Sequence, residues 1–202
     1  MKKNNTSSNN EDNKQYMIYD WQPKWLKTIS FSEFKKIEDI FWLFLLVAPS
    51  DKECYQAKRL KYFDWSDKKL WGENNYIYKE LTRIFTIDDN CLGEFKTYKE
   101  LNEELVKKNI DEKNIDKEKR EICFFIYRSK KATTLDFLRH VRNSFAHGRF
   151  ALNGEYLIME DVDIKKNADY KNKKVSINAL IVIKIENMKK IVKIIAQKNK
   201  ID

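Results

Sequence analysis

The chain has 202 residues, enough for one large domain or for one domain with a small addition. Hydrophobic residues make up 42% of it and aromatic residues 13%, with four Gly and two Pro, which excludes a collagen-like, low-complexity or wholly disordered chain. Lys and Arg outnumber Asp and Glu by 40 to 31, so the net charge is +9. This excess favours a polyanionic partner and leaves RNA, DNA and anionic membranes open.

The cysteines and the apolar stretches indicate the cellular compartment of the protein. Cys54, Cys91 and Cys123 are too far apart for a CxxC zinc motif, and we expect them to be reduced thiols. Residues 1–15 begin with a run of Lys, Asn and Ser without the apolar segment of a secretion signal, so we expect a disordered leader there. The most apolar stretch, Ile40 to Ala48, is far shorter than the roughly 20 residues that span a bilayer. These features predict a cytoplasmic protein without a membrane partner.

Positive charge is concentrated in the last third of the chain. Residues 165–202 contain eleven Lys against three acidic residues, and residues 128–149 contain six basic residues against Asp136 alone. Residues 150–164 show the opposite bias, with four acidic residues and no basic one. Two interpretations of the basic excess stay open: a surface for a polyanionic partner, or a solvated Lys-rich tail.

Apolar residues at helical spacing predict a series of helices before Gly148. Ser30 and Glu33 form a capping-box pattern at the start of a helix that Pro49 ends. Further helices are predicted over 75–85, 94–107, 121–127 and 133–146, with a polar loop or helix end over 109–119. The aromatic residues of this region, among them Phe41 and Trp42, fit a hydrophobic core, with base stacking as the alternative.

After Gly148 the pattern changes from helical to alternating. Asn153-Gly154 between two apolar runs is a strong signal for a two-residue hairpin turn, because both residues accept a positive φ. Lys174 to Lys184 alternates without interruption and predicts a third strand, and helical spacing resumes from Met188. The predicted fold is therefore mainly α: a helical bundle with a small antiparallel β-sheet, made of the hairpin plus one strand, and a C-terminal helix.

Both histidines of the chain fall in the predicted helix over 133–146 or directly after it. At 100° per residue one side of this helix is an apolar stripe and the other side is polar. The stripe consists of Leu135, Leu138, Val141 and Phe145, and the polar side of His140, Asn143, Ser144 and His147. We expect the stripe to pack in the core and the polar side to be free. Gly148 suits the position that ends a helix, and Asn143, four residues before His147, is placed to hold one tautomer of its imidazole.

Arg142 and His147 together suggest a chemistry. Arg142 lies five positions before His147, about 140° around the helix and roughly 7.5 Å along it, so one helix cannot easily aim both side chains at one atom. Two copies packed antiparallel could combine two Arg and two His in one cleft. An imidazole exchanges protons near neutral pH, and a guanidinium holds a phosphate through two hydrogen bonds. These groups can cleave RNA without a metal, because the 2′-hydroxyl supplies the nucleophile.

The string Arg142-Asn143-Ser144-Phe145-Ala146-His147, at the end of a predicted helix, resembles the R-x(4–6)-H motif of the HEPN superfamily, in which a polar residue such as Asn often follows the Arg. The resemblance implies a single HEPN-like domain over 16–202, with the β-sheet added at 149–184. It implies a homodimer that joins two motifs and a metal-independent endoribonuclease that needs no cofactor. In that family's terms, His147 is the catalytic acid and base, Arg142 the phosphate ligand and Asn143 the polar helper.

The residues that follow the motif, as far as Phe150 and the hairpin, look like a small plasmid- and phage-associated branch of that superfamily. Such proteins act in toxin–antitoxin and anti-phage defence systems, so an antitoxin or a defence-system partner is expected beside RNA. Around the motif, Arg139, His140, Ser144 and Arg149 are the expected RNA contacts.

Other interpretations stay open. His147 could be a helix C-cap stabilised by the helix dipole, Arg142 could pair with an acidic neighbour, and Arg139 and Arg149 could be solvated. For the whole protein, the alternatives are a catalytically inactive HEPN module that binds nucleic acid, nucleotides or a partner, and a scaffold whose basic tail docks on an acidic partner.

Overall fold

The computed structural model describes residues 19–20, 24–47, 76–86, 91–110, 114–128, 133–164 and 174–196. The expected leader and Cys54 lie outside these residues. The strands are β1 (Tyr19–Asp20), β2 (Cys91–Phe95), β3 (Ile122–Ile126), β4 (Phe150–Asn153), β5 (Tyr156–Ile164) and β6 (Lys174–Lys184). The helices are α1 (Phe31–Phe34), α2 (Glu38–Trp42), α4 (Tyr76–Phe85), α5 (Tyr98–Lys107), α6 (Thr133–Ala146) and α7 (Ile185–Ala196), with a π-helical turn η1 (Leu43–Val47) and a 3₁₀ turn η3 (Ile115–Lys117).

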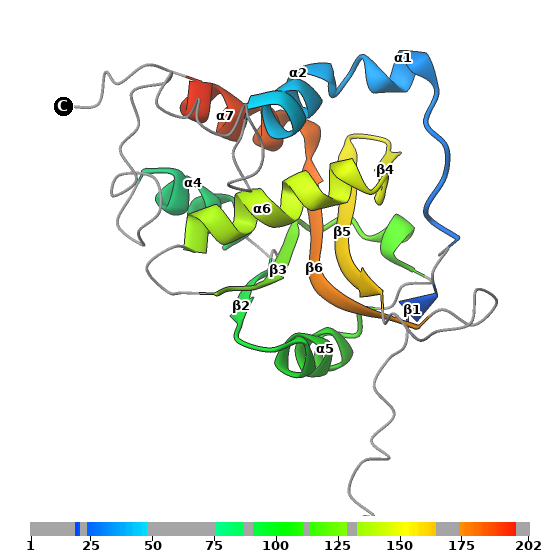
Figure 1. Ribbon diagram of the computed structural model, residues 1–202, viewed down its shortest axis with the longest axis vertical. Helices are drawn as coiled ribbons and strands as arrows, with labels where there is room; N and C mark the ends of the chain where they lie inside the picture. Colours follow the sequence, from blue (N-terminus) through cyan, green and yellow to red (C-terminus); the bar gives the residue numbers. More distant parts are fainter. Residues whose placement is uncertain are drawn as a thin grey trace, which may run out of the picture.

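A mixed sheet stands at the centre of the molecule, with helices on both sides (Figure 1). Its strand order is β2-β3-β6-β5-β4, and β1 pairs with the start of β6. β2 and β3 are parallel and are connected through α5, as parallel neighbours require, whereas the other pairs are antiparallel. Helix α6 crosses one side of the sheet, together with α2, α4 and α7, and α5 lies on the other side.

The predicted mainly-α helical bundle is wrong, because the chain forms an α/β fold. Residues 121–127 were expected to be helical, but Ile122–Ile126 forms β3, and Cys91–Phe95 forms β2 where no strand was expected. Side chains of β3 are buried on both faces of the sheet, so its apolar run has no alternation that would distinguish a strand from a buried helix. The longest described helix, α6, has 14 residues, and no helix in the described ranges could cross a membrane.

The sheet separates two hydrophobic cores. The core on the α6 side joins the sheet to α6 and α7, and the core on the α5 side joins it to α5 and η3. From β6, the first core receives Ala179, Ile181 and Ile183, and the second receives Ile177, Leu180 and Val182. Cys123 is a free thiol, and burial raises its pKa well above its usual range.

A β-bulge changes which side of β6 faces which core. Asp161 of β5 pairs with Ala179, but the next residue, Val162, pairs with Ile177, so Asn178 has no partner on β5. As a result Ile177 and Ala179, two positions apart, lie on opposite faces of the sheet. The alternation predicts the bounds of β6 correctly, but it does not show this exchange of faces.

The predicted hairpin is confirmed, with its turn moved by one residue. Asn153 pairs with Tyr156, so the two turn residues are Gly154 and Glu155. Gly154 has φ +61, and Gly154 rather than Asn153 supplies the positive φ. A glycine at the first turn position is the pattern of a type II′ turn, whereas the prediction relied on a positive φ at both Asn153 and Gly154.

The predicted helix from Ser30 begins as expected but is interrupted. The Ser30 Oγ accepts from the Glu33 N–H at 3.3 Å, and the Glu33 carboxylate accepts from the Ser30 N–H at 2.7 Å, which completes the capping box. The chain then divides into α1, α2 and η1. Apart from residues 121–127, the other predicted helices are found as α4, as α5 from Tyr98 onward, and as α6 and α7.

Candidate functional site

Helix α6 is packed on two sides, between the sheet and the helices above it (Figure 1). Leu138, Val141 and Phe145 of the predicted stripe are buried in the core on the α6 side. The opposite side was expected to be free, but His140 and Ser144 are buried there, at 2% and 1% exposure. The prediction missed this because one helix carries no information on what covers its polar side.

The end of α6 is set by Gly148, as predicted. With Gly148 at φ +65, its N–H donates to the Phe145 carbonyl at 3.1 Å, and the Arg149 N–H donates to the Ser144 carbonyl at 2.8 Å. These two bonds make a Schellman motif. His147, the residue before Gly148, is exposed, and its own N–H closes the last turn on the Asn143 carbonyl at 3.0 Å. An accessible imidazole therefore sits at a rigid helix end.

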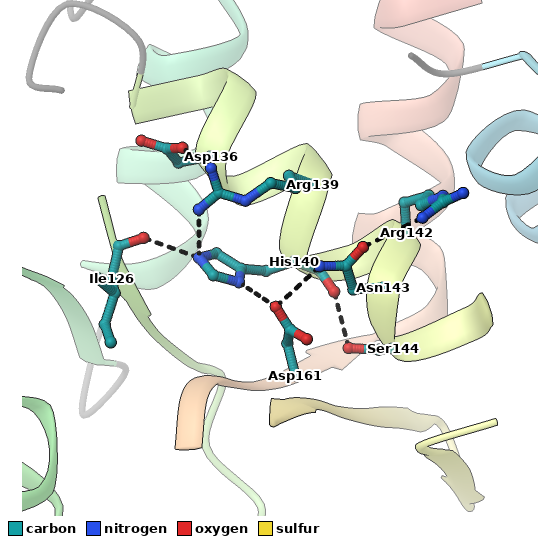
Figure 2. A network of polar contacts seen from close by, with 8 residues as sticks. All are labelled: Ile126, Asp136, Arg139, His140, Arg142, Asn143, Ser144 and Asp161. Atoms are coloured by element: carbon teal, nitrogen blue, oxygen red, sulfur yellow. Dashed lines mark hydrogen bonds and ion pairs between the residues drawn. The ribbon is translucent and has the colours of Figure 1, made fainter. Parts of the chain in front are cut away.

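His140 is held between two acceptors from the sheet (Figure 2). Its Nδ1 lies 2.6 Å from the Asp161 Oδ2 on β5, and its Nε2 lies 2.8 Å from the Ile126 carbonyl oxygen at the end of β3. A carboxylate only accepts hydrogen bonds, so the His140 Nδ1 carries a hydrogen and donates it to Asp161. The Nε2 on the other side of the ring faces the end of β3.

A buried ion pair lies beside this ring. The Arg139 Nη1 donates to the Asp136 Oδ1 at 2.5 Å, and the Arg128 N–H donates to the Asp136 Oδ2 at 2.6 Å. Burial lowers the pKa of the Arg139 guanidinium, and the charge of Asp136 opposes that shift. The Arg139 Nη2 also lies 3.3 Å from the His140 Nε2, so this nitrogen has two polar neighbours, the guanidinium and the Ile126 carbonyl.

Asn143 and Arg142 continue the network toward solvent (Figure 2). The Asn143 Nδ2 donates to the same Asp161 Oδ2 at 3.1 Å, and the Arg142 Nη1 donates to the Asn143 Oδ1 at 3.4 Å. Arg142 and Asn143 are half-buried. The expected hold of Asn143 on the imidazole of His147 is not what the structure shows, since both ends of the amide have other partners. Within the described part of the chain, neither Arg142 nor His147 takes part in an ion pair.

Arg149 is held in the interior. Its guanidinium donates to the Glu160 carboxylate through Nε at 2.5 Å and through Nη2, and both side chains are nearly inaccessible. The Glu160 N–H also donates to the Arg149 carbonyl at 3.0 Å, so the pair lies where β5 passes the end of α6. A phosphate could reach Arg149 only if this pair opened.

The seven predicted site residues thus divide by exposure. His147 is exposed, Arg139, Arg142 and Asn143 are half-buried, and His140, Ser144 and Arg149 are buried. The three residues assigned to catalysis keep contact with solvent, whereas three of the four assigned to RNA contact do not. The Ser144 Oγ donates to the His140 carbonyl at 2.9 Å, which is an interaction within the helix.

Sequence reasoning missed the acidic partners of these groups. Glu160 and Asp161 follow four buried residues of β5 and are themselves 1% and 6% exposed. Two adjacent acids in an apolar strand are a signal, because buried carboxylates require positively charged or hydrogen-bonding partners. The partners are His140 and Asn143 in the second half of α6 and Arg149 just after the helix.

No protein-family model, no curated protein and no solved structure matches this chain. The candidate site is therefore interpreted from its own chemistry. An accessible imidazole can exchange a proton, and a guanidinium without a carboxylate partner can bind an anion such as a phosphate.

Proposed function

We propose that this protein is a metal-independent endoribonuclease of the HEPN type, acting in the cytoplasm in toxin–antitoxin or anti-phage defence. The observation that carries the proposal is the exposed imidazole of His147 on the last turn of α6, with the half-buried guanidinium of Arg142 on the same helix. The resemblance of the Arg142 to His147 string to the HEPN motif supports it. The mixed sheet differs from the helical bundle of that family, so the proposal depends on these residues and not on the fold.

The proposed reaction needs one base, one acid and one anion ligand. The imidazole of His147 takes the proton of an RNA 2′-hydroxyl, the 2′-oxygen attacks the adjacent phosphorus, and the bond from phosphorus to the 5′-oxygen breaks. An imidazolium returns a proton to the leaving 5′-oxygen. Arg142 binds the phosphate oxygens as their negative charge grows in the transition state. The products are a 2′,3′-cyclic phosphate and a 5′-hydroxyl.

A homodimer supplies the second imidazole. Because Arg142 and His147 are about 140° apart around α6, one chain directs them to different places. Two copies related by a two-fold axis, with their α6 ends facing each other, would bring both pairs into one groove. In that groove one His147 accepts the proton and the His147 of the second copy donates one.

The test is RNA cleavage by purified protein in EDTA, with a long structured RNA. His147→Ala and Arg142→Ala should each lower the rate by about 10²–10⁴-fold, the usual loss on removing a general acid or base. Lys107→Ala is the matched control, since it removes an exposed cation from α5 on the other side of the sheet. DNA should not be cleaved, because it has no 2′-hydroxyl.

Four outcomes would contradict the proposal. Products with a 5′-phosphate, or activity that disappears with EDTA and returns with magnesium, would assign the chemistry to other groups. RNA binding without cleavage would favour a catalytically inactive binding module. Sedimentation at micromolar concentration that shows only monomer would exclude the composite groove.

A further inference from the structure

Asp161 occupies the point where β5 meets the polar side of α6. Its side chain is 7% exposed, and one of its oxygens, Oδ2, accepts from both His140 Nδ1 and Asn143 Nδ2, at 2.6 and 3.1 Å. The two donors are three residues apart, so they come from successive turns of the same helix. A single carboxylate from the sheet thereby fixes the position of two side chains on α6 (Figure 2).

The shared oxygen also determines which way the amide of Asn143 points. A carboxylate only accepts hydrogen bonds, so the NH₂ group of Asn143 has to face Asp161. The amide oxygen then faces the opposite way, where the Arg142 Nη1 lies 3.4 Å from it. This contact is long, so its effect is on the direction of the guanidinium more than on its binding energy.

Asp161 is one of two buried carboxylates beside the polar side of α6. The other, Asp136, pairs with the Arg139 guanidinium, and the charge of Asp161 also acts on Arg139. The other charged residue that acts on Arg139 is Arg128, whose side chain is exposed. Asp161 therefore has the His140 ring and the Asn143 amide as its two hydrogen-bond donors from α6.

We infer that Asp161 is a positioning residue of the candidate site: it anchors on His140 and turns the amide of Asn143 so that its oxygen directs Arg142. The effect on catalysis rests on the proposed function, whereas the arrangement of the three side chains does not. Two independent measurements therefore test it.

The first measurement is NMR of the wild-type protein and needs no activity. The chain has only two histidines, so the spectrum of His147→Ala contains only the signals of His140, which assigns them. At pH 7 we expect a slowly exchanging Hδ1 proton on His140, because Nδ1 donates to the buried carboxylate of Asp161. We also expect nuclear Overhauser effects from Hδ1 to the side-chain amide protons of Asn143, because both groups donate to one oxygen. A ring whose Nδ1 carries no hydrogen, or no contact to that amide, would overturn the inference.

The variants separate positioning from folding. Asp161→Asn keeps the shape of the side chain but offers an amide in place of the carboxylate, so the Asn143 amide and Arg142 Nε–H signals should shift. Asp163→Asn, at an exposed position of the same strand, is the matched control and should leave both signals in place. If Asp161→Asn does not fold, Asn143→Ala takes its place: the Arg142 signal should move while the His140 ring protons stay. Unchanged Arg142 signals in the folded variant would contradict the inference.

The second measurement is a double-mutant cycle on RNA cleavage. Asp161→Asn should lower the rate, by up to about 10²-fold if the guanidinium moves by an ångström. In an Asn143→Ala background the same change should cause no further loss, because Asp161 then has no amide to direct. Equal losses in both backgrounds would mean that Asp161 acts on the fold alone. If the wild type cleaves no RNA, the proposed function fails, and the NMR measurement still decides whether Asp161 directs Asn143 and Arg142.

Discussion

Two parts of one helix, α6, carry the same kinds of side chain in opposite situations. On the side facing the sheet, His140 and Arg139 are held by the carboxylates of Asp161 and Asp136. Near the C-terminal end, Arg142 is half-buried and His147 is exposed. In the first part the histidine and the arginine have a structural role. In the second part a ligand can reach both side chains.

The difference shows that residue type does not decide which polar group is free to act. His140 lies on the side of α6 that β3 and β5 cover, whereas His147 lies beyond the edge of that contact, where Gly148 turns the chain away. Asp161 of β5 forms a hydrogen bond with His140, whereas the side chain of His147 is left accessible.

The largest expected effect is on stability, from His140→Ala. Removing the imidazole takes the donor at 2.6 Å away from the buried carboxylate of Asp161, and a buried charged acceptor without that partner costs about 3 kcal/mol of unfolding free energy. His147→Ala, the matched change at the exposed histidine, should stay within about 0.5 kcal/mol of the wild type. Urea unfolding of both variants measures the difference. Equal midpoints for the two would remove the distinction between the two parts of α6.

A medium effect is expected from Gly148→Ala, which tests the end of the helix. No atom lies within 4 Å of the added methyl group, so the cost is that of a side chain at φ +65, about 1–2 kcal/mol. Gly154→Ala in the hairpin turn has the same kind of cost, since its φ is +61 and its surroundings are equally open. Only the change at Gly148 should also lower RNA cleavage, because it moves His147. Equal cleavage by the two variants would contradict this role.

The smallest effect concerns a more accessible pair, Glu118 and Arg120. The hydrogen bond from Arg120 to the Glu118 side chain is the main reason that the pKa of Glu118 lies below its usual value of 4.5. The pair therefore stabilises the folded protein above about pH 4.5, and this stabilisation is lost as the pH falls through the lowered pKa of Glu118. Solvent screens this pair, so Glu118→Gln should cost about 0–1 kcal/mol at pH 7.

Urea unfolding of Glu118→Gln at pH 7 and at a pH well below 4.5 tests the direction of this pH dependence. The difference from the wild type should shrink at the acidic pH, and Glu103→Gln, at an exposed position of α5, should show no such change. A difference that grows in acid would reverse the assignment.

The parts of the fold that the sequence predicts are those with local signals. Thr133–Ala146 has helical spacing and a terminal glycine, and Lys174–Lys184 alternates, so both elements were predicted with their observed bounds. Ile122–Ile126 has no period because both faces of the sheet are covered there. Cys91–Phe95 pairs with it in parallel, a contact that only the tertiary fold creates. Because these two strands were not predicted, the expected sheet was only a small addition to a helical bundle.

The candidate site was predictable to the same degree. The placement of Arg142, Asn143 and His147 on one helix follows from helical geometry alone. The partners of His140 and Asn143 do not, because Asp161 is 21 and 18 residues away in the sequence and reaches them only when β5 packs on α6. Burial of Arg149 likewise requires Glu160.

The bulge at Asn178 is a place where β6 can lose a residue and keep its two-sided pattern. Ile177 faces the α5 side although it is two positions from Ala179, because Asn178 is left over between them. Replacing Asn178, which is half-buried, would keep every neighbour on its present side. Deleting it would make Ile177 the neighbour of Ala179, and regular alternation would still place Ile177 on the α5 side. Deleting a residue between Ala179 and Ile183 would instead exchange the faces of part of the strand. In the evolution of this protein, loss of residue 178 should therefore be tolerated better than loss of a residue farther along β6.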